Sequence, residues 1–377
     1  MSFPRRVAKC LVCGKESLLI SANLGGCGFC LKERAEDALP IAMKVHAERR
    51  RHFGLPSFPP KSKSGVSCRL CVNECVIPNG ERGYCGLVEN REGRLIRLRG
   101  TFSKGLLEWY YDPLPTNCVA AWVCPGCTGS GFPSYAYRPN AEYGYFNLAV
   151  FYAACSFDCL FCQNWTFREH ARRLKPVVSA WELADKCNER VSCICYFGGD
   201  PAVQMAHSIK TSELAVRKAE EWRGIMRVCW ETNGTMNWPL LKRAAVLAYE
   251  TGGCIKFDLK AWSEPLNIAL CGATNKRTLE NFSRLKVFMR KTEPPFLVAS
   301  TLLVPGYIDV EEVRNIAGFI ADVDPEIPYS LLAFHPHYIM DDLPTTSRRL
   351  ALECAAAAKD EGLVNVNIGN VHLLADY

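Results

Sequence analysis

The sequence predicts an α/β fold in which a partial (β/α)6 barrel follows small cysteine-rich metal-binding modules. Two observations favour this fold. Six apolar runs alternate with helix-like stretches from about residue 146 to 334, as in parallel α/β domains. The chain also has 21 cysteines in 377 residues, many of them in closely spaced pairs ahead of that region. The apolar runs are FNLAVFY, CICYF, MRVCW, CIKFDL, FLVASTLLV and YSLLAF.

The sequence indicates in which cellular compartment the protein is expected. The first residues lack the continuous apolar segment of a secretory signal, and no run of roughly 18 apolar residues could span a bilayer. We therefore expect a cytoplasmic protein without a membrane partner, whose cysteines are metal ligands or buried thiols rather than disulfides. The net charge of +6 is modest and does not call for a nucleic-acid partner.

Residues 1–54 predict a zinc-ribbon-like or rubredoxin-like module followed by a helix. Two CxxC pairs, each beside glycine, offer four thiolates, and four thiolates close the coordination shell of one tetrahedral ion. We therefore expect a structural site, with either zinc or iron as its metal. A Pro/Ser/Lys-rich linker at 55–65 follows the module. The expected ligands are Cys10, Cys13, Cys27 and Cys30.

Residues 66–145 predict a second cysteine-rich module. Four cysteines surround a PNGERG turn, a CPGC pair follows farther along, and the alternating stretch EGRLIRLRG predicts a strand hairpin. These cysteines predict at least one further metal site, occupied by zinc or by an auxiliary iron–sulfur cluster, whereas Cys118 also fits a free thiol. The expected ligands are Cys68, Cys71, Cys75, Cys85, Cys124 and Cys127.

Residues 146–340 carry the predicted barrel, and residues 341–377 add a helix and a strand that complete its core. Start signals mark several helices: a capping box of Ser179 and Glu182, an opening at Asn237, and another at Asp309. In such a barrel, functional side chains gather at the carboxyl ends of the strands. The residues that follow each apolar run are therefore the candidates for the functional site.

Three cysteines follow the first run, in AACSFDCLFCQN. Cubane clusters normally take four thiolates, so Cys155, Cys159 and Cys162 would leave one iron open to another ligand. The CxxxCxxC spacing resembles that of the radical S-adenosylmethionine (SAM) enzymes. Residues 146–340 resemble the glycyl-radical-enzyme activases, such as pyruvate formate-lyase activating enzyme, in a branch with extra cysteines upstream.

The resemblance implies a SAM-binding role for the strand ends FGGDP, WETNG, KFDLKAW and LLAFH and for the aromatic residue inside the cysteine triad. Independently, a zwitterionic ligand needs a cation and an anion at fixed separation. Two residues spaced by two on a strand end point the same way, as Asp258 and Lys260 would. The implied SAM contacts are Phe161, Gly198, Gly199, Asp200, Glu231, Thr232, Asn233, Asp258, Lys260 and His335.

The resemblance implies an enzyme with a [4Fe-4S] cluster that cleaves SAM reductively to a 5′-deoxyadenosyl radical, which abstracts hydrogen from a carbon of a peptide or protein. An electron donor such as flavodoxin or ferredoxin is the expected second partner. For the specific reaction we expect a post-translational modification in an anaerobic archaeon, such as cobalamin-dependent C-methylation, although the chain has no DxHxxG-type cobalamin motif. The alternatives are a glycyl-radical activase and a non-enzymatic zinc protein that binds RNA or a partner.

Overall fold

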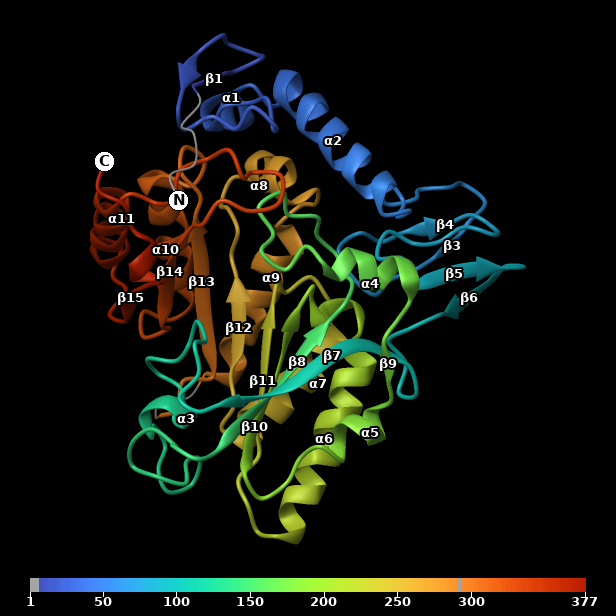
Figure 1. The fold of residues 1–377 in the computed structure, drawn as a ribbon, viewed down its shortest axis with the longest axis vertical. Helices are drawn as coiled ribbons and strands as arrows, with labels where there is room; N and C mark the ends of the chain where they lie inside the picture. The colour runs from blue at the N-terminus through green and yellow to red at the C-terminus, as the bar shows by residue number, and fades with distance from the viewer. Residues whose placement is uncertain (1–6, 290–292) are drawn as a thin grey trace.

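The protein is built around one nine-stranded sheet, seen in a computed structural model that describes residues 7–289 and 293–377 (Figure 1). The strand order is β15-β14-β13-β12-β11-β10-β8-β7-β9. Neighbours from β8 to β15 are parallel, whereas β7 and β9 add an antiparallel edge. The parallel strands are β8 (Phe146–Tyr152), β10 (Val191–Gly198), β11 (Arg227–Thr232), β12 (Ile255–Asp258), β13 (Leu297–Leu303), β14 (Tyr329–Ala333) and β15 (Val366–Gly369).

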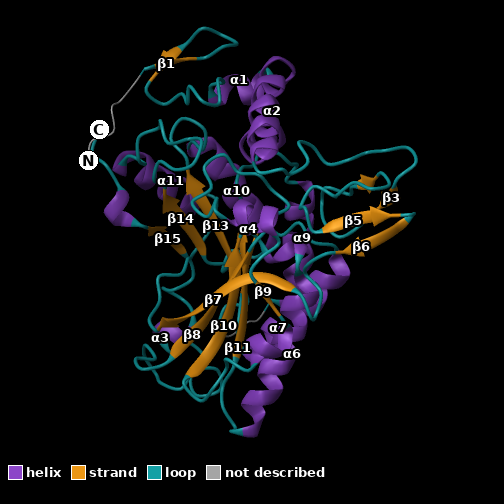
Figure 2. Ribbon diagram, turned by 45° about the vertical axis from the view of Figure 1, so that its right-hand side comes forward, coloured by secondary structure: helices purple, strands orange, loops and turns teal. Residues whose placement is uncertain are grey.

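The predicted α/β class with a parallel sheet is confirmed, and each of the six apolar runs contains a strand. β15 adds a seventh parallel strand beyond the six βα units. Figure 2 shows the strands gathered in the middle of the molecule with helices around them. The helices of this part are α4 (Phe167–Arg173), α5 (Ala180–Ala184), α6 (Met205–Glu221), α7 (Trp238–Thr251), α8 (Glu264–Cys271), α9 (Lys276–Arg284), α10 (Val310–Val323) and α11 (Arg348–Asp360).

Local capping explains where several of these helices begin. Ser179 and Glu182 form the reciprocal capping box at α5. The side chain of Asn237 accepts a hydrogen bond from the Leu240 amide at 3.2 Å, and that of Asp309 accepts one from the Glu312 amide at 2.9 Å. Each bond satisfies an amide that a helix leaves unpaired in its first turn, so these predicted boundaries are confirmed.

The amino-terminal segment forms a hairpin and two helices that lie over one end of the barrel (Figure 1). Its elements are β1 (Ala8–Lys9), β2 (Glu16–Ser17), α1 (Gly28–Glu33) and α2 (Ala35–His52). Lys32 pairs with Asp309 at 3.0 Å, and Asn23 donates to the Ile339 carbonyl at 2.7 Å. A Cβ at Gly28 would lie 2.4 Å from the Gly306 carbonyl oxygen, so only glycine allows this close approach.

The segment between this module and β8 contains two small hairpins, one strand of the central sheet and a short helix. β3 (Val66–Ser67) pairs with β4 (Val76–Ile77), and β5 (Val88–Arg91) pairs with β6 (Arg94–Arg97), which is the predicted hairpin. β7 (Gly105–Pro113) then joins the central sheet, β9 is Val177–Val178, and α3 is Pro125–Thr128. Division of the chain into units at 54, 65, 145 and 340 stays a prediction. Among the described residues, no helix combines the length and apolarity needed to cross a bilayer.

Candidate functional site

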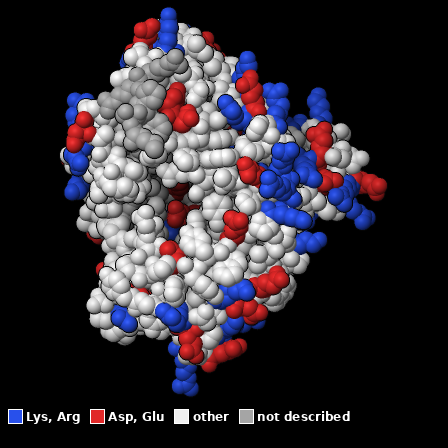
Figure 3. Space-filling view, in the orientation of Figure 1, with Lys and Arg blue, Asp and Glu red and all other residues white. Residues whose placement is uncertain are grey.

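A cleft of about 450 Å³ lies at the carboxyl ends of the parallel strands. Figure 3 shows this face hollowed near its middle, with acidic and basic atoms inside the hollow. Every residue of the expected cysteine triad and SAM site lines this cleft except His335, which follows β14 and does not line it. The residues brought together are Cys155, Cys159, Phe161, Cys162, Gly198, Gly199, Asp200, Glu231, Thr232, Asn233, Asp258 and Lys260.

The cysteine triad lies on the loop that leaves β8. The loop turns at Ala154, whose φ of 103° is a backbone conformation that residues with a Cβ rarely adopt. The Cys155 Sγ accepts hydrogen bonds from the Phe157 amide at 3.3 Å and from Asn233 Nδ2 at 3.5 Å. Burial, together with the nearby Asp200 carboxylate, raises the pKa of the Cys155 thiol well above its ordinary value. Coordination to a metal would reverse this shift, since a coordinating thiol is deprotonated.

A buried cluster of charges holds the triad loop in place. Asp158, between the first two cysteines, accepts from Arg168 at 2.7 Å and contacts His46 Nδ1 at 2.9 Å, while Arg50 lies 3.6 Å away. Burial alone would raise the pKa of Asp158, but Arg168, His46 and Arg50 lower it below its usual range. His46 and Arg50 belong to α2, so the amino-terminal helix braces the triad loop. The sequence alone does not predict a role for any of these residues, because no local pattern identifies them.

The strand ends after β10 and β11 are tied together by Asp200. Its Oδ1 accepts from the Ala202 amide at 2.6 Å and from the Thr232 hydroxyl at 2.9 Å, and its Oδ2 accepts from the Asn233 amide at 2.6 Å. Burial raises the pKa of this carboxyl to about 6. A Cβ at Gly199 would lie 2.5 Å from the Ala154 carbonyl oxygen, so glycine lets this loop pack against the triad loop.

Asp258 and Lys260, at the end of β12, supply adjacent opposite charges in the cleft. Their side chains contact each other, and Lys260 Nζ lies 5.7 Å from the centre of the Phe161 ring. Burial opposes the charge on Lys260, but Asp258 and Cys159 raise its pKa above the ordinary value. The second oxygen of Asp258 is buried and has no hydrogen-bond partner among the residues that the structure describes. An orphaned acceptor beside a buried ammonium fits a ligand that carries both a cationic and an anionic group.

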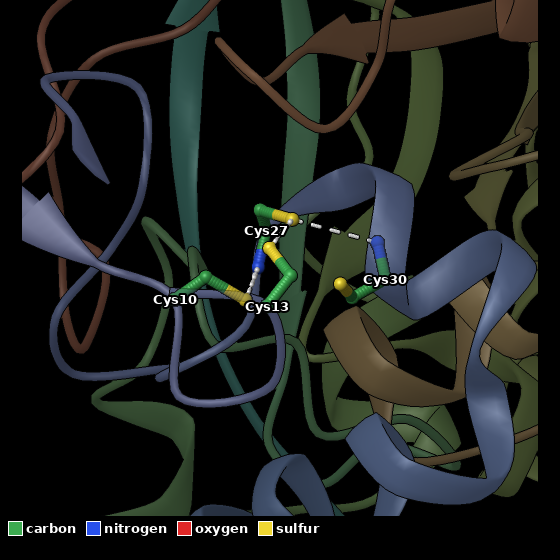
Figure 4. Close-up of side chains that lie close together, drawn as sticks. All are labelled: Cys10, Cys13, Cys27 and Cys30. Atoms are coloured by element: carbon green, nitrogen blue, oxygen red, sulfur yellow. Dashed lines mark hydrogen bonds between the residues drawn. The ribbon is translucent and has the colours of Figure 1, made fainter. Parts of the chain in front are cut away.

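The first cysteine module brings its four sulfurs into one group. The ligand atoms of Cys10, Cys13, Cys27 and Cys30 all lie within 4.8 Å of one another, and those of Cys13 and Cys27 are 3.9 Å apart (Figure 4). Zinc–sulfur bonds of about 2.3 Å in a tetrahedron place sulfurs about 3.8 Å apart, so the group fits one metal ion. Burial opposes ionisation of Cys10, but backbone amides of Cys13 and Cys27 lower its pKa to about 6.

The second set of cysteines is spread more widely. Within residues 7–289 and 293–377, the first module is the one group of three or more side chains whose ligand atoms meet the 4.8 Å spacing. Cys68, Cys75 and Cys85 all raise the pKa of Cys71 after the larger effect of its burial, so the four lie near one another. The side-chain Nδ2 of Asn73, inside this segment, donates to the Ser156 carbonyl at 2.6 Å and so contacts the triad loop.

The CPGC pair lies on a different side of the molecule from this set. Cys124 and Cys127 belong to the α3 segment, far from β3 and β4 in both ribbon views. The structure therefore does not bring all six cysteines of residues 66–145 into one site. The metal content of each set stays a prediction.

These features define the class of protein. It is an open parallel α/β barrel with three cysteines and a pair of opposite charges at the carboxyl ends of its strands. The sequence profile of the radical SAM superfamily matches residues 149–320. This part of the chain is therefore a radical SAM domain. The radical SAM family implies a 4Fe-4S cluster and SAM as cofactors.

Two curated relatives come from Methanocaldococcus jannaschii. The uncharacterized protein MJ0808 is 27% identical over 312 residues, which cover 81% of each chain. MJ1632, provisionally named a glycyl-radical enzyme activating enzyme, is 28% identical over 181 residues, or 48% of this chain and 61% of its own.

Among solved structures, a domain of pyruvate-formate lyase-activating enzyme from Bacteroides vulgatus matches 47% of this chain and 98% of its own, at 18% identity and a TM-score of 0.37. Streptococcus suis SuiB bound to precursor peptide SuiA matches 58% of this chain and 47% of its own, at 15% identity and a TM-score of 0.44.

Proposed function

We propose that this radical SAM enzyme abstracts hydrogen from a carbon of a peptide or protein substrate. The observation that carries the proposal is the single cleft that collects the triad, the glycine loop after β10 and the Asp258–Lys260 pair. These groups come from three strand ends, those of β8, β10 and β12, and the orphaned oxygen of Asp258 points to a polar ligand group that the described residues do not supply.

Different residues of the chain would then bind the cluster and SAM. Cys155, Cys159 and Cys162 would hold a [4Fe-4S] cluster and leave one iron open. Lys260 would pair with the carboxylate of SAM and Asp258 with its amino group. The cluster and SAM, when bound, supply a 5′-deoxyadenosyl radical, as in the radical SAM class.

Apolar side chains suit this cleft for radical chemistry. Phe157, Phe161, Phe167 and Phe197 all line the cleft that holds the triad. Aromatic walls exclude water and so protect a reactive intermediate from side reactions. They also offer a flat surface on which an adenine ring can pack.

The shape of the cleft supports an extended substrate. Its lining continues from the triad across β13 and β14 to Asn367 and Asn370 at the edge strand β15, and it includes Trp122 and Asn117 from the loop after β7. Asparagine amides both donate and accept hydrogen bonds, as peptide groups require of a partner. The provisional name of MJ1632, a glycyl-radical enzyme activating enzyme, is consistent with a protein substrate.

The test is anaerobic reconstitution with iron, sulfide, SAM and dithionite, followed by mass analysis of the nucleoside products. We expect 5′-deoxyadenosine from the wild type and from Cys354→Ala, a buried thiol in α11, and none from Cys155→Ala. Equal product from Cys155→Ala and the wild type would refute the assignment of the triad.

The same assay separates the finer reactions when it is run with a substrate. S-adenosylhomocysteine beside 5′-deoxyadenosine would support radical C-methylation, with cobalamin as the expected methyl carrier. A stable glycyl radical in a partner protein would support an activase. Zinc alone, with no cluster absorbance and no SAM cleavage, would support a non-enzymatic zinc protein and contradict our proposal.

A further inference from the structure

The interior of the barrel, next to the SAM cleft, is lined with sulfur. A separate cavity of about 250 Å³ lies between β10, β11, β12 and the loop after β7, and it meets the cleft at Cys118, Phe197 and Glu231. Barrel interiors of this kind are usually filled by bulky branched apolar side chains. Here six thiols line the space: Cys118, Cys124, Cys193, Cys195, Cys229 and Cys254.

The strand alternation shows that these thiols face inward. On β10, Cys193 and Cys195 line the cavity, whereas Tyr196 points outward and its hydroxyl lies 2.9 Å from that of Ser212 on α6. Cys195 is the direct partner of Cys229 on β11. The Cys229 Sγ lies 3.9 Å from the Cys254 Sγ, just before β12. β10, β11 and the residue just before β12 thus present thiols to the same space.

A buried lysine lies among these sulfurs. Lys256 on β12 is 2% exposed, and its Nζ lies 3.0 Å from the Cys118 Sγ and 3.1 Å from the Cys195 Sγ. Its one carboxylate partner is Glu231 at 3.4 Å, among the ion pairs of the described residues. A buried ammonium is costly without anionic partners, and neutral thiols are weak ones. The surroundings therefore favour an anionic sulfur-containing group beside Lys256.

We propose that this cavity holds an iron–sulfur cluster ligated by Cys118, Cys195, Cys229 and Cys254, in addition to the cluster at the triad. Four cysteine thiolates hold a [2Fe–2S] cluster, two on each iron, and thiolates on the same iron lie close together. Cys229 and Cys254, whose sulfurs are 3.9 Å apart, would share one iron, and Cys118 and Cys195, which lie 3.0 and 3.1 Å from Lys256 Nζ, would share the other. Lys256 would donate hydrogen bonds to cluster sulfur.

The test measures iron, acid-labile sulfide and zinc in the anaerobically reconstituted full chain. Its background is Cys155→Ala/Cys159→Ala/Cys162→Ala, which removes the triad. Adding Cys195→Ala/Cys229→Ala is expected to remove about two irons and two sulfides per chain. The matched control adds Cys187→Ala/Cys354→Ala, two buried thiols outside the cavity, and should remove neither.

Equal iron and sulfide in the cavity variant and its control would overturn the proposal, and so would zinc bound in the cavity in place of iron. Circular dichroism establishes whether both variants fold. If the cavity variant does not fold, Lys256→Gln in the same background keeps every thiol. Loss of hydrogen bonds to cluster sulfur should lower the reduction potential of one cluster signal in a titration followed by electron paramagnetic resonance. A titration that superimposes on the background would then overturn the proposal.

Discussion

The amino-terminal cysteine group and the triad loop use the same side chain in opposite ways. At Cys10–Cys30 the protein places four sulfurs within 4.8 Å of one another, so the protein would supply all four ligands of one ion. At Cys155–Cys162 it supplies three sulfurs beside a cleft and adds Lys260, Asp258 and a glycine loop. The difference shows that the number of thiols, and what faces the missing one, separates a structural metal site from a site open to a ligand.

The two regions also differ in what holds them. Amides of the first module bond to its own sulfurs: the Cys27 amide donates to Cys10 Sγ at 3.4 Å and the Cys30 amide to Cys27 Sγ at 3.5 Å. The triad loop has one such bond, from the Phe157 amide to Cys155 Sγ, and depends in addition on α2 and α4, through His46, Arg50 and Arg168 around Asp158. We therefore expect substitutions in the first site to destabilise mainly the first module. Substitutions around Asp158 should destabilise the triad loop together with the helices that contact it.

The largest effect should come from removing a ligand of the first site. Cys27→Ser is expected to release one metal ion per chain and to unfold residues 7–33, because structural zinc contributes about 10 kcal/mol or more to folding in small modules. Metal analysis and limited proteolysis measure this, with Cys354→Ala as control. SAM cleavage should persist. If Cys27→Ser also lost the iron of the triad, the first site would not be structurally independent of the triad loop.

Asp158→Asn should give the next largest effect. The substitution keeps the shape but leaves Arg168 and Arg50 buried without a counter-charge, at a cost of about 3–5 kcal/mol. Urea unfolding measures the loss. Asp185→Asn, which removes an exposed partner of Lys218, should change stability by less than about 0.5 kcal/mol. Similar effects of the two variants would show that the charge cluster does not hold the triad loop.

His207 allows a test through pH. It contacts the hydroxyl of Tyr152, the last residue of β8, at 2.7 Å, and burial lowers the pKa of His207 to about 4. A histidine whose folded pKa is depressed contributes stability above its unfolded value of about 6.5, which is lost as pH falls toward 4. The expected loss is roughly 3 kcal/mol. Urea unfolding of wild type and His207→Gln at pH 7 and 4.5 should show a smaller pH dependence for the variant; equal dependence would contradict this.

Lys260→Met should give the smallest of these effects, measured on ligand binding. Loss of a charged hydrogen bond to SAM costs about 1.5–3 kcal/mol, or roughly 10- to 150-fold in Kd. Anaerobic calorimetric titration of SAM into the reconstituted protein measures this. Lys276→Met, which removes an exposed partner of Glu264, should leave Kd unchanged. An unchanged Kd in Lys260→Met would place the ligand's carboxylate elsewhere.

Local patterns were sufficient for much of the fold. The six apolar runs became β8 and β10–β14, and the caps at Ser179, Asn237 and Asp309 began helices where expected, because these signals act over a few neighbouring residues. The strand ends of a parallel sheet must meet at one edge, so the triad and most of the expected SAM contacts share a cleft. His335 was placed by resemblance alone, and it does not line that cleft.

The sequence by itself determined the order of strands and helices, the paired cysteines and the residues at each strand end, since each depends on spacing along the chain. Only the tertiary structure decided that α2 packs against the triad loop, that the CPGC pair lies apart from Cys68–Cys85, and that thiols from β10 and from the loop after β7 contact Lys256. These groups join residues up to 138 positions apart. No local propensity encodes such pairs, because their contact energies exist only after the sheet and its covering helices have packed.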